Sequence, residues 1–167
     1  HPFIAEDGSA VYIPKGYFKE TKGKLLGEYE VVVLGVEYEE IKEEIQRLRK
    51  RFHIKAYCTM SDQEVAEAMN LDSESAKRAK DRQFTETVLE ADKGAQEELK
   101  KKFNVAIGGK GIHVYGKGAD KGKAVKLLTE MYSQTGKPMT IGLGNSYTDE
   151  PMLRAVDVPV LVRNPDG

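Results

Sequence analysis

The chain has 167 residues, with 26 Lys and Arg against 27 Asp and Glu, a net charge of -1, 40% hydrophobic residues and one cysteine. This balance of charge argues against a surface that coats nucleic acid and against a polybasic membrane anchor, whereas small anionic substrates stay compatible with local charge clusters. Cys58 has no partner cysteine in the chain, and no apolar run approaches the roughly 20 residues of a membrane helix. We therefore expect a cytoplasmic protein of one or two compact units.

The N-terminal residues predict a hairpin, or a strand that ends at a functional loop. Two apolar stretches, Ile4-Ala5 and Ala10–Ile13, flank the turn residues Asp7-Gly8-Ser9. The stretch 19–27 is rich in Gly, Lys and Glu, and we interpret it as a solvated connection and a domain boundary. Because the first residues have strand character and no Met precedes them, we expect the sequence to begin inside a domain.

Residues of about 28–107 predict a small α/β unit. Apolar residues at 41, 45, 48 and 52 have the spacing of an amphipathic helix, and Ser61 and Glu64 have the capping-box spacing that opens another. Strands are expected at 30–34, 54–58, 84–89 and 105–107, and further short helices from about 73 and at 96–103. This order of elements suits an open α/β sandwich.

The last third predicts a doubly wound parallel arrangement. Strands are expected at 112–115, 140–143 and 158–162, with a helix after Asp120 and a short helix at 150–156 between them. In such folds, ligands bind outside the carboxyl ends of the strands. The loop before Lys121 and the loop 144–149 are therefore where chemistry is expected.

These two loops carry groups suited to a phosphate and to a hard cation. Lys121 lies beside Gly118 and Gly122 at a predicted helix N-terminus, where a cation and free N–H groups suit a phosphate; the alternative is an ordinary surface lysine. Loop 144–149 offers the Asp149 carboxylate and the side-chain oxygens of its neighbours, which suit Mg²⁺. The alternative there is a helix N-cap, with Asp149 complementing the helix dipole.

A second group of candidates lies in the middle of the chain. Arg82 and Glu86 flank Phe84 on a predicted strand, and because strand side chains alternate, both are expected on one face. There they either bind a substrate carboxylate and sugar hydroxyls or form a cross-strand ion pair. The glycine run 108–111 lacks the Gly-Lys-Ser/Thr of a Walker loop. Lys110 and His113 are able to contact an anion there, although a packed or surface His is the commoner outcome.

Taken together, three segments resemble the C-terminal half of a phosphatase of the haloacid dehalogenase superfamily, in the subclass with a large α/β (type IIB) cap: 120–124, 142–153 and 158–162. Within that superfamily, segments 3–10, 82–86 and 108–114 are similar to the mannosyl-3-phosphoglycerate phosphatase family. The resemblance covers nearly the whole chain. It implies an α/β fold in which a partial Rossmann-type core at 1–20 and 112–167 carries an α/β cap domain at 21–111.

The resemblance also implies residue roles. The family transfers a phosphoryl group to an aspartate, with Mg²⁺ holding phosphate and nucleophile together, and water then hydrolyses the aspartyl-phosphate. Lys121 matches the lysine that neutralises the crowded negative charge. Asn145 matches the position of an aspartate ligand of Mg²⁺, and Asp149 matches the acidic residue that supports the metal. The positions that face the substrate are Arg82, Glu86, Lys110 and His113, with Asp7, Gly8 and Ser9 at the junction of core and cap.

The chain departs from the family pattern in two ways. No Asp-x-Asp occurs in the 167 residues, so we expect the nucleophile, roughly the first third and a C-terminal tail to be missing, and the chain alone to be inactive. Asn145 brings no negative charge, which predicts weaker metal binding, and Thr148 stands where an asparagine is usual.

The expected function is thus Mg²⁺-dependent hydrolysis of mannosyl-3-phosphoglycerate to mannosylglycerate and phosphate, a step in making a compatible solute. The expected partner is a small phosphorylated sugar, without nucleic acid or membrane. Two alternatives stay open. One is a phosphatase of the same class acting on another sugar phosphate, such as glucosyl-3-phosphoglycerate. The other is a non-catalytic module or pseudo-enzyme that binds phosphorylated sugars.

Overall fold

The computed structural model describes residues 1–108, 111–134 and 136–163. The chain divides into two compact units. Unit 1 comprises His1–Gly35 and Gly118–Gly167, and unit 2 comprises Val36–Lys117. No helix within the described ranges has both the length and the apolar character needed to cross a lipid bilayer.

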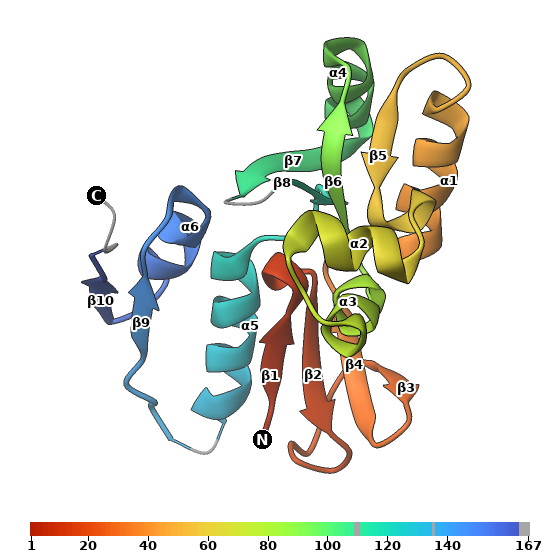
Figure 1. The fold of residues 1–167 in the computed structure, drawn as a ribbon. Coiled ribbons are helices and arrows are strands. Elements are labelled where there is room, and N and C mark those ends of the chain that lie inside the picture. The colour runs from red at the N-terminus through yellow and green to blue at the C-terminus, as the bar shows by residue number, and fades with distance from the viewer. Residues whose placement is uncertain (109–110, 135, 164–167) are drawn as a thin grey trace. The chain divides into compact units, whose positions relative to one another are not determined.

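Unit 1 opens with an antiparallel sheet of four short strands (Figure 1). In spatial order they are β1 (Phe3–Ala5), β2 (Ala10–Pro14), β4 (Tyr29–Val33) and β3 (Lys24–Leu26). The first two strands pair with Phe3 opposite Tyr12 and are joined by the short 3-10 helix η1 (Glu6–Gly8). The predicted hairpin is therefore confirmed.

Helix α5 (Lys121–Ser133) covers one face of this sheet. Side chains two residues apart point to the same face of a strand, so Val11 and Ile13 both point toward the helix. There they form a buried cluster with Ala124 and Met131. The helix also packs against η1, and this contact places its N-terminal residue, Lys121, beside the turn between β1 and β2.

The C-terminal part of unit 1 is a parallel pair of strands with a short helical connection. It consists of β9 (Ile141–Gly144), the 3-10 helix η3 (Tyr147–Asp149), α6 (Glu150–Leu153) and β10 (Val158–Leu161). One face of β9 packs on the α6 side, whereas Ile141 and Leu143 on the other face are more than half exposed. Within the described ranges β9 pairs with β10 alone, so its other edge is free.

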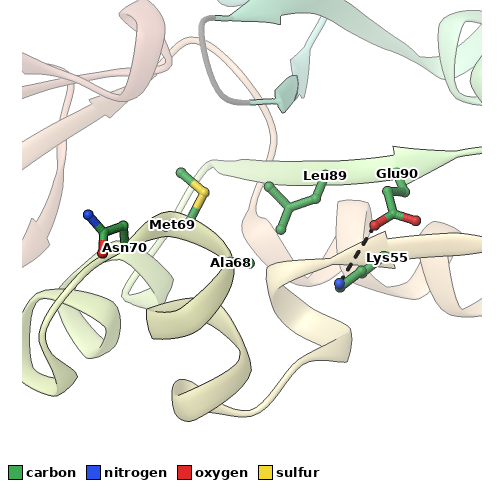
Figure 2. A pocket seen from close by; sticks show the side chains of 6 residues that line it. All are labelled: Lys55, Ala68, Met69, Asn70, Leu89 and Glu90. Atoms are coloured by element: carbon green, nitrogen blue, oxygen red, sulfur yellow. Dashed lines mark ion pairs between the residues drawn. The ribbon is translucent and has the colours of Figure 1, made fainter.

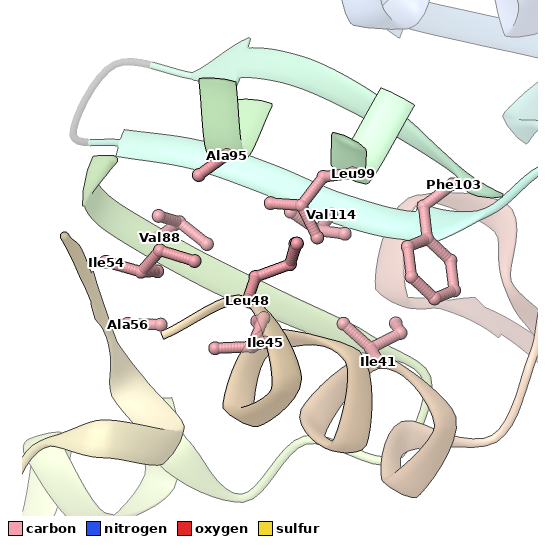
Figure 3. Close-up of a cluster of buried hydrophobic side chains, with 10 residues drawn as sticks. All are labelled: Ile41, Ile45, Leu48, Ile54, Ala56, Val88, Ala95, Leu99, Phe103 and Val114. Carbon is pink, nitrogen blue, oxygen red and sulfur yellow. The ribbon is translucent and has the colours of Figure 1, made fainter. Parts of the chain in front are cut away.

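Unit 2 is an antiparallel sheet with two helices on one face. The strands, in spatial order, are β5 (Ile54–Ala56), β6 (Thr85–Ala91), β8 (Gly111–Gly116) and β7 (Phe103–Gly108). Helices α1 (Tyr38–Leu48) and α4 (Lys93–Lys102) cover the face that carries Val88 and Val114. Figure 3 shows the resulting core, in which Ile41, Ile45 and Leu48 of α1 are fully buried as the helical spacing predicts.

Two further helices, α2 (Asp62–Met69) and α3 (Ser73–Lys80), pack beside the 3-10 helix η2 (Tyr57–Thr59) and contact Leu89 of β6. The predicted capping box is present at the start of α2. The Ser61 hydroxyl accepts a hydrogen bond from the Glu64 amide at 3.2 Å, and the Glu64 carboxylate accepts one from the Ser61 amide at 2.6 Å.

The structure differs from the sequence interpretation in two regions. Residues 24–26, expected in a connection, form β3 and pair with β4, so residues 21–35 lie in unit 1 and not in the unit expected at 21–111. The strand at 112–115, expected in a parallel core sheet, is antiparallel between β6 and β7 in unit 2. Strand periodicity predicts that a strand forms but not which strand it pairs with, which explains the second difference. Residues 24–26 are too few for a periodic pattern, and their pairing with β4 makes them a strand.

Candidate functional site

Three charged side chains of unit 1 meet where η1, the start of α5 and the loop after β9 come together. Lys121 Nζ donates a hydrogen bond to Asp149 Oδ1 at 2.8 Å and lies 3.5 Å from Asp7 Oδ1. Each side chain is between 15% and 26% exposed. The cluster therefore joins segments far apart in the sequence and still opens to solvent.

The second oxygen of Asp149 organises the loop after β9. Asp149 Oδ2 accepts hydrogen bonds from the amides of Asn145 and Ser146, at 3.1 and 3.2 Å, and from the Ser146 hydroxyl at 2.9 Å. Burial alone would raise the pKa of Asp149, but the hydrogen bond from Lys121 and those from the loop outweigh it and lower the pKa to about 2. Asp149 is therefore ionised at neutral pH and fixed at both oxygens.

The same contacts keep Lys121 charged. Burial would lower its pKa, but the hydrogen bond to Asp149 and the negative charge of Asp7 outweigh burial, so the pKa of Lys121 lies above its ordinary value. One ammonium against two carboxylates leaves the cluster with an excess of negative charge. An anionic ligand that contacts Lys121 thus requires a further positive charge nearby.

Two glycines allow the three segments to approach. A Cβ on Gly8 would lie 2.5 Å from the backbone carbon of Asp120 and 2.6 Å from the Lys121 nitrogen, and the φ of Gly8 is +82°. A Cβ on Gly144 would lie 2.6 Å from the Cβ of Asp149. Any larger residue at either position would push the charged groups apart.

The turn that carries Asp7 is held in an uncommon backbone conformation. Glu6 and Asp7 have φ of 47° and 58°, in the left-handed region that residues other than glycine rarely adopt. Ser9 follows the turn and is completely buried; its carbonyl accepts hydrogen bonds from the amides of Leu34 and Gly35. The turn thus brings Asp7 to Lys121 and Gly8 against α5, whereas Ser9 is placed inside the unit.

The residues expected to bind Mg²⁺ fit that role only in part. The exposed side chain of Asn145 has an amide oxygen that could bind a metal. Both oxygens of Asp149, however, already accept hydrogen bonds, one from Lys121 and the other from the loop. Among the described residues, no group of three or more His, Cys, Asp and Glu side chains is close enough to hold a metal. Asn145 and Asp149 therefore do not form a magnesium site by themselves.

In unit 2, Glu86 lies inside the protein. Its carboxylate is fully buried and accepts hydrogen bonds from the Tyr38 hydroxyl at 2.7 Å, from the Cys58 amide at 3.0 Å and from the Thr87 amide at 2.7 Å. Burial and the adjacent Glu86 carboxylate raise the pKa of Tyr38 and of the Cys58 thiol, so both stay protonated. Glu86 thereby ties α1 and η2 to β6.

The other expected substrate residues of unit 2 are not gathered on one face. Glu86 pairs with Val114 and Thr87 with His113, so Glu86 and His113 point to opposite faces of the sheet. Arg82 precedes β6, and its Nε donates a hydrogen bond to the Ala79 carbonyl at 2.9 Å. The expectation that Arg82 and Glu86 share a strand face is therefore wrong. Lys110 lies outside the described residues.

Several contacts of these sites could not be found from the sequence. The contact of Asp7 with Lys121, and those of Tyr38 and Cys58 with Glu86, join residues distant in the chain, and no local pattern indicates them. Ser146 did give a local signal, because it stands three residues before Asp149 in capping-box spacing, and the two side chains form that box at the start of η3.

Comparison with known proteins finds one family and several close relatives. Residues 42–166 match the model of the haloacid dehalogenase-like hydrolases. A glucosyl-3-phosphoglycerate/mannosyl-3-phosphoglycerate phosphatase of Persephonella marina is 38% identical and covers 96% of this chain, and one of Methanococcoides burtonii is 40% identical over all of it. A mannosyl-3-phosphoglycerate phosphatase of Pyrococcus horikoshii is 37% identical over 96% of the chain. The chain spans 63% of the length of the P. marina protein, 65% of the M. burtonii protein and 67% of the P. horikoshii protein.

Proposed function

Because the chain belongs to the haloacid dehalogenase-like hydrolases, we propose that it acts in a phosphatase that hydrolyses mannosyl-3-phosphoglycerate to mannosylglycerate and phosphate. The observation that carries the proposal is the cluster of Lys121, Asp149 and Asp7 at the carboxyl end of β9. The names of the relatives support the substrate. The P. horikoshii protein is named for mannosyl-3-phosphoglycerate, and the other two are named for it and for its glucosyl counterpart.

In this proposal, Lys121 binds the phosphate of the substrate. Its ammonium is held in place by Asp149 and stays charged, so it needs no rearrangement to meet a developing negative charge. Phosphoryl transfer depends on such fixed positive charge, because the transferred group carries its charge on three oxygens. Asp149 is a positioning residue, which sets the direction of Lys121 and the shape of loop 144–149.

The attacking carboxylate comes from residues outside the 167, because the chain contains no Asp-x-Asp. The free edge of β9 offers a place for it. A strand that pairs with β9 in parallel would end at the same side of the sheet as loop 144–149 and so beside Lys121. Ile141 and Leu143 are exposed on one face of β9, which is unusual for a parallel sheet, so we expect a further element to pack on that face.

We also propose Mg²⁺ as the cofactor, with Asn145 contributing one oxygen ligand. The metal would supply the positive charge that the cluster of two carboxylates and one ammonium lacks. Since Asn145 is neutral and exposed, this chain's contribution to the affinity is small, and the remaining ligands come from substrate, water and residues outside the sequence.

Unit 1 is then part of the catalytic core and unit 2 the cap. In this proposal Asp7, Gly8 and Ser9 lie in the part of the core that leads to the cap. On the cap, His113 is the best placed of the expected substrate residues, because its face of the sheet is the one not covered by α1 and α4. Arg82 and Lys110 stay candidates for binding the glycerate carboxylate. Glu86 is buried and has a structural role, because it holds α1 and η2 against β6. Cys58 is a free thiol, which suits the reducing cytoplasm that we propose as the location.

The proposal is tested first by the intact mass of the protein isolated from its source and then by phosphate release from that protein. Lys121→Ala is expected to lower turnover by at least about 100-fold with the fold retained, and Lys123→Ala, which removes an exposed lysine two residues away, to leave it unchanged. Equal activity of the two variants would remove Lys121 from the mechanism. A substrate panel with the mannosyl and glucosyl compounds then decides between the two sugars.

A second candidate function is a non-catalytic module that binds phosphorylated sugars. Two observations favour it, the absence of an Asp-x-Asp and the neutral Asn145. If the isolated protein has the 18.6 kDa of this sequence, binds mannosyl-3-phosphoglycerate through Lys121 and releases no phosphate, this candidate replaces the first.

A further inference from the structure

Unit 2 contains a pocket that the proposed phosphatase chemistry does not use. It has a volume of about 430 Å³ and is open to solvent on one side. The lining residues come from three elements: Lys55 of β5, Leu89 and Glu90 of β6, and Ala68, Met69 and Asn70 at the end of α2. All of them belong to unit 2, whereas Lys121 and Asp149 belong to unit 1.

A β-bulge in β6 shapes this pocket. Lys55 stands opposite Glu90 and Ala56 stands opposite Val88, so Leu89 is an extra residue without a partner on β5. In a regular strand Leu89 and Glu90 would point to opposite faces. The bulge turns both to the same side of β6, as Figure 2 shows, and bulges commonly re-aim side chains at binding sites.

The charges of the pocket are balanced. Glu90 pairs with Lys55 at 3.6 Å, and its other carboxylate oxygen lies 3.3 Å from His53 Nε2. The carboxylate is 59% exposed and the lysine 40% exposed, so both keep bonding capacity toward solvent. One ammonium and one carboxylate cancel, which disfavours an anion such as phosphate and equally a metal cation.

The rest of the lining offers an apolar surface and an amide. Met69 and Leu89 are half-buried and belong to the cluster beneath α2 and α3. Asn70 ends α2 with left-handed backbone angles, φ 52° and ψ 53°, and is exposed. A ligand therefore meets apolar atoms on one side and donors and acceptors on the other.

We propose that this pocket binds a neutral hexopyranose. The carboxylate of Glu90 accepts hydrogen bonds from two sugar hydroxyls, Lys55 and Asn70 donate to sugar oxygens, and the C–H face of the ring lies on Met69 and Leu89. The volume is within the range of small-molecule sites. The proposal does not depend on the phosphatase assignment, since no residue of the Lys121 cluster takes part.

The test is an NMR titration of the isotope-labelled chain with methyl α-D-mannopyranoside. Because the pocket is open, a Kd in the millimolar range, on the order of 1 to 10 mM, is expected from the amide signals of Lys55, Asn70 and Glu90. Inorganic phosphate is expected to leave these signals unmoved. Pocket signals that do not respond to the sugar, or that respond to phosphate alone, would overturn the proposal.

Glu90→Gln removes a charged acceptor at an exposed position and keeps the shape of the side chain. It is expected to weaken sugar binding at least about tenfold and, because Lys55 then lacks its partner, to let phosphate shift the pocket signals. Glu97→Gln is the matched control, since Glu97 forms a similarly exposed pair with Lys100 at 3.2 Å on α4. Equal sugar affinity in both variants would show that the pocket does not hold the sugar through Glu90.

Discussion

Replacing Asp149 by Asn tests the charged cluster directly, because it keeps the size of the side chain and removes its charge. The contacts of the carboxylate lower its pKa from the ordinary 3.8 to about 2. Each pKa unit corresponds to about 1.4 kcal/mol, so the ionised form contributes about 2 kcal/mol to the stability of the folded state. Asp149→Asn is therefore expected to lose about 2 kcal/mol at pH 7.

The sign of the pH dependence follows from the lowered pKa. The stabilisation is fully present above the unfolded-state pKa near 3.9 and is lost as the pH falls toward the folded-state value of about 2. The difference between wild type and Asp149→Asn should thus be constant from pH 7 down to about 5 and shrink between about pH 4 and 2.

The assay is urea unfolding at a series of pH values, followed by the amide signal of Ala124, which is buried in α5 of unit 1. Asp157→Asn is the comparison for a carboxylate whose pKa is lowered mainly by hydrogen bonds, so its loss is expected to be smaller than that of Asp149→Asn. Asp157 accepts two hydrogen bonds from Thr140 at 2.8 Å but forms no ion pair in the described ranges. A difference for Asp149→Asn that stays the same at low pH would refute the electrostatic reasoning and indicate lost packing.

Three further predictions concern the backbone, the metal and the buried carboxylate. Gly8→Ala should lower the free energy of unfolding by at least about 2 kcal/mol and displace α5. The control Gly16→Ala has a similar φ of +75° and nothing within 4 Å of the added Cβ, so it should cost only about 1 kcal/mol. Equal losses of the two variants in urea unfolding would contradict the close approach of Gly8 to α5. Asn145→Asp should tighten Mg²⁺ binding in calorimetry, and an unchanged affinity would place that side chain away from the metal. Glu86→Gln should destabilise unit 2 by about 1–3 kcal/mol, because an amide cannot accept from all three donors, and Tyr38→Phe should cost less; a neutral Glu86→Gln in thermal unfolding would speak against these bonds.

Local patterns in the sequence predicted much of the fold. The spacing of Ile41, Ile45 and Leu48 gave α1 and its buried face, and the Ser61 and Glu64 pair gave the start of α2. Both signals lie within a few residues, where helical geometry alone decides the outcome. Partner choice in the sheets was not predictable in this way, because the pairing of 112–115 with β6 joins residues far apart in the chain.

The candidate site was predictable in part for a similar reason. Lys121 and Asp149 were selected by their positions in loops at the ends of predicted elements, and the structure brings them to 2.8 Å. The shared face expected for Arg82 and Glu86 was wrong, since Arg82 lies before β6 begins and the strand period does not extend to it. Alternation along a strand fixes relative orientation only for residues inside that strand, and Arg82 lies outside it.

The discontinuous course of unit 1 has a consequence for the order in which the protein acquires its structure. On the ribosome, β1 to β4 emerge before unit 2, but the side of Val11 and Ile13 that packs on α5 stays uncovered until α5 has been translated. Unit 2 is a continuous stretch that lies between them, so its core can close while unit 1 still waits for its helix. Unit 2 is therefore expected to fold before unit 1, because the core of unit 1 is complete only once α5 is present.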